Sequence, residues 1–151
     1  MKNNFVLEDF LPFRLNRLAA EVSERLSEMY VDQFDLDIPK WRVLATLSNA
    51  GETTAQAIVA STRTHKSTIS RAVTELETRG LVERAVHGID RRSNALRLTS
   101  AGQVLFGQLR PKVLAYEEAL LARIGAPDAE AMLSGIAALE EVLGLKRAHK
   151  S

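Results

Sequence analysis

The sequence predicts a mainly α-helical protein that carries one small β-hairpin. Apolar residues recur at steps of three and four over most of the 151-residue chain, which is the repeat of an amphipathic helix. Near residue 97 the pattern changes, because Leu96 and Leu98 alternate with Arg97 as in a half-buried strand. Glycine and proline separate these patterns into short segments. The sequence therefore predicts long helices on both sides of a central unit that contains the hairpin.

The central unit is expected to begin with two short helices joined by a turn. Thr53 and Gln56 have the spacing of a capping box at the start of the first helix, and the turn follows at residues 61–64. The second helix has one apolar stripe, formed by Ile69, Ala72, Val73 and Leu76. Gly80 stands where a helix commonly ends in the left-handed conformation. Because the stripe must face a core, the opposite face of this helix is open to a partner.

Two short strands are expected after the second helix, at residues 81–86 and 95–98. The loop between them, residues 87–94, contains a glycine and the adjacent cations Arg91 and Arg92. Helix, turn, helix and hairpin in this order predict a winged helix-turn-helix over residues 37–100. A basic helix face and a basic wing on one unit can contact the major and minor grooves of DNA together.

The distribution of charge also indicates contact with DNA. The whole chain has a net charge of +1, but residues 61–99 carry eight cations against four anions. A basic region on an otherwise acidic protein is the electrostatic footprint of a nucleic-acid interface. We expect DNA contacts from the second helix, its preceding turn and the wing, at Arg63, His65, Lys66, Ser67, Thr68, Ser70, Arg71, Asp90, Arg91 and Arg92. The alternatives are a merely solvated helix face and a wing whose arginines only approach phosphates.

The same region resembles the MarR family, the multiple-antibiotic-resistance-type regulators of bacterial transcription. The helix pattern over residues 67–77 matches the family, as do Gly80, Leu81 and Val82. The wing signature D-x-R followed by L-T-x-x-G is formed here by Asp90, Arg92, Leu98, Thr99 and Gly102. The resemblance implies a homodimer that regulates transcription, usually in response to a small-molecule effector. It also implies that Arg92 enters the minor groove while Asp90 holds its guanidinium in position.

A long amphipathic segment precedes the central unit. Apolar residues recur at helical steps from residue 9 to residue 34, with Pro12 in the first turn, where proline is tolerated. Pro39 opens a second helix over residues 40–47, in which Trp41 is expected to be a core residue. A helix with so continuous an apolar stripe needs a surface on which to pack.

Two further helices are expected after the wing. The first begins at residue 99 or 100, is kinked by Pro111 and stops at Gly125, and the second follows directly. These apolar stripes exceed what one small winged unit can cover, so a second copy is expected to pack on them. The expected organisation is a single domain over residues 1–151, with dimerisation helices at 9–36 and 101–147.

Several other classes of protein do not fit the sequence. The chain has no cysteine, which excludes disulfides and a thiol redox switch. His65, His87 and His149 lie far apart, and no glycine-rich phosphate loop or nucleophile motif occurs, so we expect no metal, no cofactor and no enzymatic activity. No apolar run approaches the ~20 residues of a membrane span, and the N-terminus lacks the layout of a signal peptide. We therefore expect a cytoplasmic protein.

The expected function is that of a homodimeric regulator, a repressor released from a pseudo-palindromic operator by a small organic acid of aromatic type or by a derivative of such an acid. Arg14 and Arg17 on the first helix are the candidates for contact with the acid, which family members hold between the dimerisation helices and the winged unit. Arg17 should form a surface pair with Glu21, whereas Arg14 has no local anion and could instead reach solvent or pair across the dimer. The alternative from another class is a winged-helix protein-interaction module without specific DNA binding.

Overall fold

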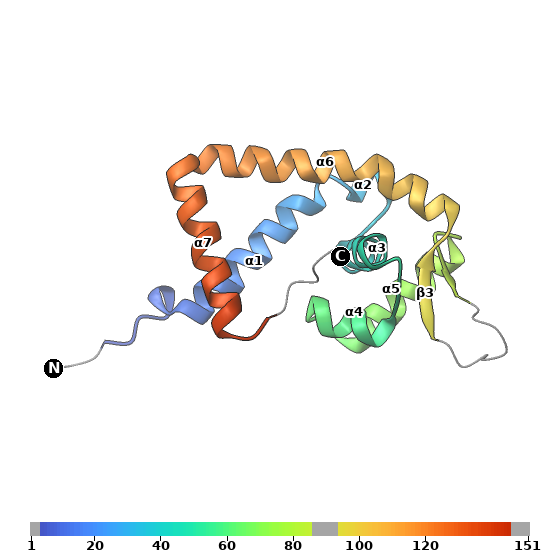
Figure 1. The fold of residues 1–151 in the computed structure, drawn as a ribbon, viewed down its shortest axis with the longest axis horizontal. Helices are drawn as coiled ribbons and strands as arrows, with labels where there is room; N and C mark the ends of the chain where they lie inside the picture. The colour runs from blue at the N-terminus through green and yellow to red at the C-terminus, as the bar shows by residue number, and fades with distance from the viewer. Residues whose placement is uncertain (1–3, 86–93, 146–151) are drawn as a thin grey trace. The chain divides into compact units, whose positions relative to one another are not determined.

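The computed structural model describes residues 4–85 and 94–145 of the chain (Figure 1). After the 3-10 turn η1 (Leu7–Asp9), the helices are α1 (Leu11–Ser27), α2 (Val31–Phe34), α3 (Ile38–Ala50), α4 (Ala55–Thr62), α5 (Lys66–Thr78), α6 (Ser100–Ile124) and α7 (Ala126–Val142). The strands are β1 (Glu52–Thr54), β2 (Val82–Arg84) and β3 (Ala95–Leu98). This architecture confirms the predicted fold class. The chain divides into two compact units, residues 1–112 and 113–151, and α6 runs from the first into the second.

The first long helix is shorter than the sequence predicted. α1 ends at Ser27 and α2 begins only at Val31, so the expectation of one helix from residue 9 to residue 34 was wrong. The amides of residues 28–30 bond to carbonyls three residues earlier, which tightens the backbone into a turn, and Tyr30 leaves the helical conformation. Tyr30 is nevertheless fully buried. Because Tyr30 occupies an apolar position of the helical repeat, the periodicity of the sequence did not reveal that α1 ends at Ser27.

The sheet has a third strand that the sequence pattern did not predict. β1 directly precedes α4, and the strand order is β1-β3-β2 with antiparallel pairing throughout. Thr53 pairs with Leu96 in this sheet and does not cap α4. Instead, Thr54 Oγ1 accepts a hydrogen bond from the backbone amide of Ala57 at 3.1 Å. The predicted capping box of Thr53 and Gln56 was therefore wrong by one residue, because Thr53 is paired with Leu96 in the sheet and Thr54 caps the helix.

The alternation predicted for β3 is confirmed. Leu96 and Leu98 are buried, whereas Arg97 lies on the exposed face of the sheet. Arg97 stands opposite Glu52 of β1 and Glu83 of β2. Its Nε donates to Glu83 Oε1 at 2.9 Å, and its Nη1 lies 3.7 Å from Glu52 Oε1. One arginine thus joins all three strands on the exposed face.

The second strand of the hairpin leads into α6 through Thr99. The Thr99 hydroxyl donates to the carbonyl of Gly80 at 2.6 Å and accepts from the amide of Gly102 at 3.1 Å, so it caps α6. The Thr99 amide donates to the carbonyl of Leu81 at 3.1 Å. Gly80 has a φ of +70°, which confirms the predicted left-handed end after α5. A Cβ at Gly102 would overlap the carbonyl oxygen of Leu81, so the close approach of α6 to this strand requires glycine.

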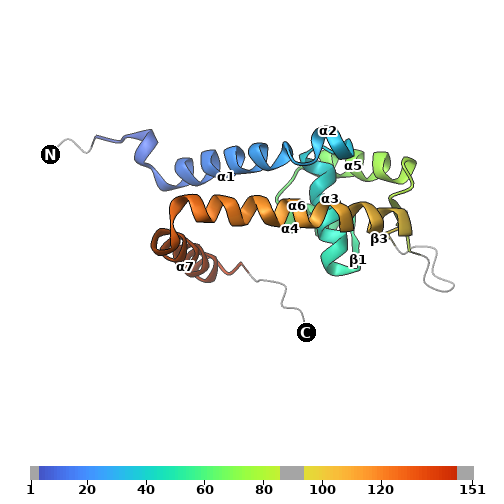
Figure 2. The same ribbon diagram turned by 90° about the horizontal axis from the view of Figure 1, so that it is seen from above.

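The core of the first unit lies where α3, α4 and α5 meet the sheet (Figure 1). Its fully buried side chains come from all of these elements and from α6, and include Val43, Leu44, Leu47, Ile58, Ile69, Leu76, Leu96 and Leu109. In Figure 2 α1 leads into the short helix α2, and hydrogen bonds from Arg79, the residue after α5, reach Phe34 at the end of α2 and Asp35 beyond it. The packing therefore surrounds one side of α5 and leaves its other side open.

The second unit contains the end of α6 and the whole of α7. The two helices meet at Gly125, which has a φ of +86° and ends α6 as predicted. α6 continues through Pro111 as a single helix of 25 residues, and the kink at that proline remains a prediction. Met132 and Ile136 of α7 are exposed. Among the described helices, none has both the length and the apolar content that crossing a membrane requires.

Candidate nucleic-acid interface

α4 and α5 form the predicted helix-turn-helix. The turn covers residues 63–65, with Arg63 in the left-handed conformation (φ 53°) and His65 at the N-cap of α5. The apolar stripe of α5 is buried, since between 0% and 4% of each side chain is exposed at Ile69, Ala72, Val73 and Leu76. This burial confirms the inward face that the sequence predicted. It also fixes the opposite face of α5 toward solvent.

The exposed start of α5 carries most of the residues that the sequence assigns to DNA. The structure brings seven of them together on the turn and the first half of the helix, namely Arg63, His65, Lys66, Ser67, Thr68, Ser70 and Arg71. Thr68 is half-buried and the other six are exposed. Among the described residues, none forms a hydrogen bond or an ion pair with the side chain of Lys66 or Arg71. Their donors are therefore available to phosphates and base edges.

The acidic residues of α5 lie farther along the helix and are paired. Glu75 Oε2 is 2.6 Å from Lys40 Nζ of α3, and Glu77 Oε1 is 3.4 Å from Arg84 Nε of β2. The hydrogen bond to Glu75 raises the pKa of Lys40 above its usual value, so the ammonium is kept charged. Negative charge on α5 is thus matched by cations and held away from the start of the helix.

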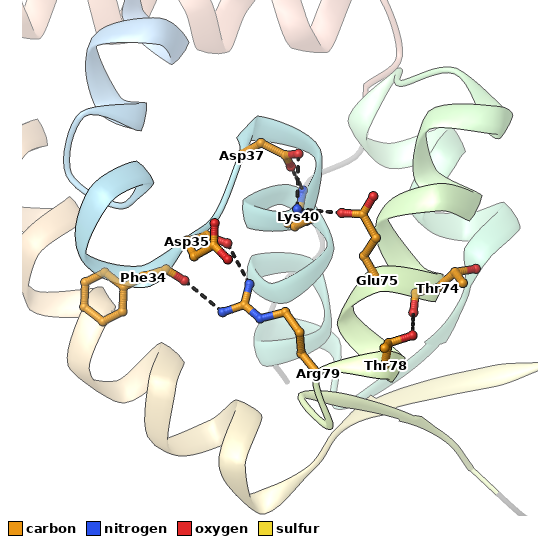
Figure 3. Close-up of polar contacts among 8 residues, drawn as sticks. All are labelled: Phe34, Asp35, Asp37, Lys40, Thr74, Glu75, Thr78 and Arg79. Atoms are coloured by element: carbon orange, nitrogen blue, oxygen red, sulfur yellow. Dashed lines mark hydrogen bonds and ion pairs between the residues drawn. The ribbon is translucent and has the colours of Figure 1, made fainter.

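Polar contacts of Glu75 and Arg79 fasten the second half of α5 and the residue after it to residues 34–42, which are named the support segment below (Figure 3). Arg79 follows the last residue of α5, and its Nη1 and Nη2 donate to the carbonyls of Asp35 (2.6 Å) and Phe34 (2.9 Å). The pair between Lys40 and Glu75 lies nearer the middle of the helix. Sequence reasoning missed these contacts because their partners are far apart in the chain and two of the acceptors are backbone carbonyls, which carry no residue signal.

The support segment also reaches the turn before α5. Arg42 Nη1 donates to Thr64 Oγ1 at 3.0 Å, and both residues are half-buried. On the other side of the segment, Trp41 stacks between Tyr30 and Phe106, with ring centroids 5.5 and 5.7 Å apart. Burial raises the pKa of Tyr30 to about 12. Trp41 is therefore a packing residue, in agreement with its predicted role, and it holds the start of α3 against α6.

Comparison with known proteins identifies the family. A model of the MarR family matches residues 34–93. The HTH-type transcriptional repressor IacR of Pseudomonas putida is 32% identical over 100 residues, a match that spans 66% of this chain and 59% of IacR. A MarR family transcriptional regulator from Silicibacter pomeroyi has a crystal structure with 29% identity and a TM-score of 0.75, covering 91% of this chain and 89% of that one. The chain belongs to the MarR family.

A more distant structure resembles this MarR-family chain in fold alone. BpsR of Bordetella bronchiseptica is 18% identical, with a TM-score of 0.74 over 96% of this chain and all of BpsR. The DNA binding of BpsR is regulated by 6-hydroxynicotinic acid. Because MarR proteins are transcriptional regulators, membership of the family confirms the expectation that the chain is not an enzyme.

The wing signature of the MarR resemblance is only partly visible in the structure. Asp90, Arg91 and Arg92 lie outside the described residues, so their contacts with DNA remain predictions. Thr99 and Gly102, the other part of the signature, have the structural roles given above. This half of the signature therefore reflects how the hairpin is attached to α6.

The two residues predicted to bind an effector lie on the surface of α1. Arg14 and Arg17 are both exposed. The pairing predicted between Arg17 and Glu21 was wrong, because Glu21 Oε1 accepts a hydrogen bond from Arg25 Nε at 2.9 Å, one helical turn in the other direction. The first unit has a solvent-open hollow of about 640 Å³ between α2, the end of α5 and the start of α6. Neither Arg14 nor Arg17 lines it, so the structure does not bring them to a pocket within one chain.

Metal chemistry finds no support in the described part of the chain. Within it, no three histidine, aspartate or glutamate side chains are grouped as metal ligands would be. His65 stands alone at the start of α5, and His87 and His149 lie outside the described residues.

Proposed function

We propose that this protein is a homodimeric repressor that reads a pseudo-palindromic operator through α5. The observation that carries the proposal is the division of α5 into a buried stripe and an exposed, cationic start. Arginine forms bidentate contacts with guanine edges, and lysine neutralises phosphates. Arg71 and Lys66, whose side chains no described residue engages, therefore supply the chemistry for specificity and for affinity.

A second copy of the chain completes the proposed regulator. α1 has no buried residue, and Leu11, Leu15 and Leu18 on one side of it are 54%, 41% and 57% exposed. An apolar stripe left open in this way is typical of an interface between protein chains. A two-fold dimer would present two copies of α5 to half-sites about one DNA turn apart, which is why the operator should be pseudo-palindromic.

The proposed effector is a small aromatic acid that the protein meets in the cytoplasm. The regulation of BpsR by 6-hydroxynicotinic acid supports this class of compound, since BpsR shares the fold. We assign its carboxylate to Arg14, which is exposed on α1 beside the apolar Leu11 and Leu18 and has no polar partner among the described residues. A guanidinium flanked by apolar side chains suits a ligand that is both aromatic and anionic.

The test of DNA reading compares operator binding by two variants of α5 over a range of salt concentrations. Arg71→Ala should lose about 1–3 kcal/mol of binding free energy and relax the preference at one operator position. Lys66→Ala should weaken binding to all sequences alike and reduce the salt slope by about one unit. Arg123→Ala is the matched control, because Arg123 is an exposed cation near the end of α6. Equal binding by all variants would refute the assignment, and binding without salt dependence would favour the protein-interaction module.

The test of the effector is a titration of aromatic acids, with their thioesters as controls, against the protein–operator complex. The acids should release DNA, and Arg14→Ala should require a higher concentration than the wild type, whereas Arg17→Ala should not. An Arg14→Ala protein that responds at the wild-type concentration would exclude Arg14 as the anchor. Release by thioesters or uncharged compounds alone would exclude the acid class.

A further inference from the structure

The support segment contacts α5 and its preceding turn at three levels. Arg42 bonds to Thr64 in the turn, Lys40 pairs with Glu75 in the second half of the helix, and Phe34 and Asp35 accept hydrogen bonds from the residue after its end. Figure 3 shows the second and third of these contacts, with α5 running alongside α3. One short stretch of chain is therefore fastened along the whole length of the reading helix.

The contact at the turn lies nearest to the residues assigned to DNA. Thr64 directly follows Arg63, which has a left-handed φ of 53° that side chains rarely adopt, and it precedes the N-cap of α5. His65 at the N-cap accepts no hydrogen bond through its side chain. The start of α5 thus lacks a side-chain cap. Within the turn the Thr64 hydroxyl donates only a long hydrogen bond to the carbonyl of Thr62 at 3.4 Å, and the shorter bond from Arg42 fixes the turn from outside the helix.

The start of α3, from which Arg42 extends, is well packed. Trp41, its neighbour, is stacked between Tyr30 and Phe106, and Val43 on its other side is fully buried. Asp37 caps α3 by accepting from the amide of Lys40 at 2.9 Å. A guanidinium that extends from so well-packed a helix can hold a turn in one place, because its own backbone has little freedom to follow.

We propose that Arg42 is a positioning residue for DNA recognition, which through Thr64 sets the angle at which α5 enters the major groove. This inference rests on the proposed function and extends it to a residue that does not touch DNA. Hydrogen bonds to base edges demand exact placement of the helix, whereas phosphate contacts through long flexible side chains tolerate small rotations. Loss of the Arg42 contact should therefore reduce discrimination between sequences more than it reduces binding to DNA in general.

The experiment uses Thr64→Val, which removes the hydroxyl and keeps the shape of the side chain. The full-length protein is titrated with an operator that the wild type selects from a randomised pool and with an unrelated duplex of equal length. Thr64→Val should bind the operator roughly fivefold more weakly, which is the effect of losing the hydrogen bond from Arg42, and bind the unrelated duplex as before. The salt slope should not change, because no phosphate contact is lost. Thr64→Ser keeps the hydroxyl and should restore wild-type discrimination.

Two further variants separate positioning from stability. Thr78→Val is the matched control, since the Thr78 hydroxyl donates only to the carbonyl of Thr74 within α5, and it should keep full discrimination. Thr64→Val also removes the longer hydrogen bond from the Thr64 hydroxyl to the carbonyl of Thr62 at 3.4 Å, whereas Arg42→Met removes only the contact from Arg42. Arg42→Met should therefore reproduce most of the loss of discrimination, and the double variant should be no worse than Thr64→Val, because both changes remove the contact between Arg42 and Thr64. In the free protein, both single variants should accelerate amide hydrogen exchange at the start of α5.

The outcomes that would overturn the inference are distinct from those that would overturn the function. Unchanged discrimination in Thr64→Val, an equal loss on both duplexes, or additive effects in the double variant would each refute the role of Arg42 while DNA reading by α5 stands. A wild type that does not distinguish the two duplexes would refute the proposed function, and this inference with it.

Discussion

Replacing Gly102 by alanine tests whether the close approach of α6 to the hairpin is essential to the fold. Gly102 is buried in the first turn of α6. A Cβ there would overlap the Leu81 carbonyl oxygen and stand 3.1 Å from the Leu81 carbonyl carbon and 3.4 Å from Leu98 Cβ. The oxygen belongs to the backbone and accepts a hydrogen bond from the Thr99 amide, so it cannot move without loss.

The magnitude follows from three contributions to the free energy of unfolding. Alanine in a helix is favoured over glycine by at most about 1 kcal/mol. Overpacking of a buried site costs about 1–3 kcal/mol, and weakening the Thr99–Leu81 hydrogen bond costs about 1 kcal/mol more. The cost of the steric overlap therefore exceeds the gain in helix propensity, and Gly102→Ala should lower the free energy of unfolding by about 2 kcal/mol. In urea this is a midpoint lower by roughly 1 M.

The control lies in the same helix. Gly107 of α6 has no atom within 4 Å of an added Cβ, so Gly107→Ala should gain stability from helix propensity, by at most about 1 kcal/mol. Both variants are unfolded in urea at equal protein concentration and followed by far-UV circular dichroism. If Gly102→Ala is as stable as Gly107→Ala, the steric account of this junction is wrong.

Three other predictions concern stability, assembly and the wing. Between about pH 10 and about 12 the free energy of unfolding should fall by about 2–3 kcal/mol, because the pKa of Tyr30 is higher in the folded protein and the unfolded chain therefore loses this proton first. In a pH series of urea unfolding curves, Tyr30→Phe should remove most of this loss of stability and leave only the part that comes from the raised pKa of Lys40. Leu18→Glu should give a monomer at micromolar concentration in sedimentation, and a persistent dimer would exclude α1 from the interface. Asp90→Ala should weaken operator binding if Asp90 holds Arg92 in place, whereas a flexible wing should bind as well or better after losing an anion.

Elements that depend on local spacing could be predicted from the sequence. The buried stripe of α5 needs only the positions of Ile69 to Leu76 along one helix, and the end after α5 needs only Gly80. The exposed face at the start of α5 follows from the same stripe, because a helix has two sides. For these residues the local sequence pattern is sufficient to predict the structure.

Features that depend on distant partners could not be predicted. β1 is three residues long and is a strand only because β3 pairs with it, so no local pattern marks it. The break before α2 is hidden because Tyr30 occupies a position that continues the apolar repeat. Arg42 and Thr64 are 22 residues apart, and neither has a neighbour in sequence that suggests the other. The contacts of the support segment with α5 form only in the folded chain, between residues that are far apart in the sequence.

The order of the strands has a consequence for biosynthesis. Among the described strands, β1 and β2 each pair only with β3, which comes last in the chain. On the ribosome both outer strands, and all of α5 between them, are synthesised before the strand that joins them exists. Until residues 95–98 emerge, the nascent chain exposes two unpaired strands, and the Thr99 cap of α6 can form only after that point. The DNA-binding unit can therefore complete its sheet only after β3 has left the ribosome.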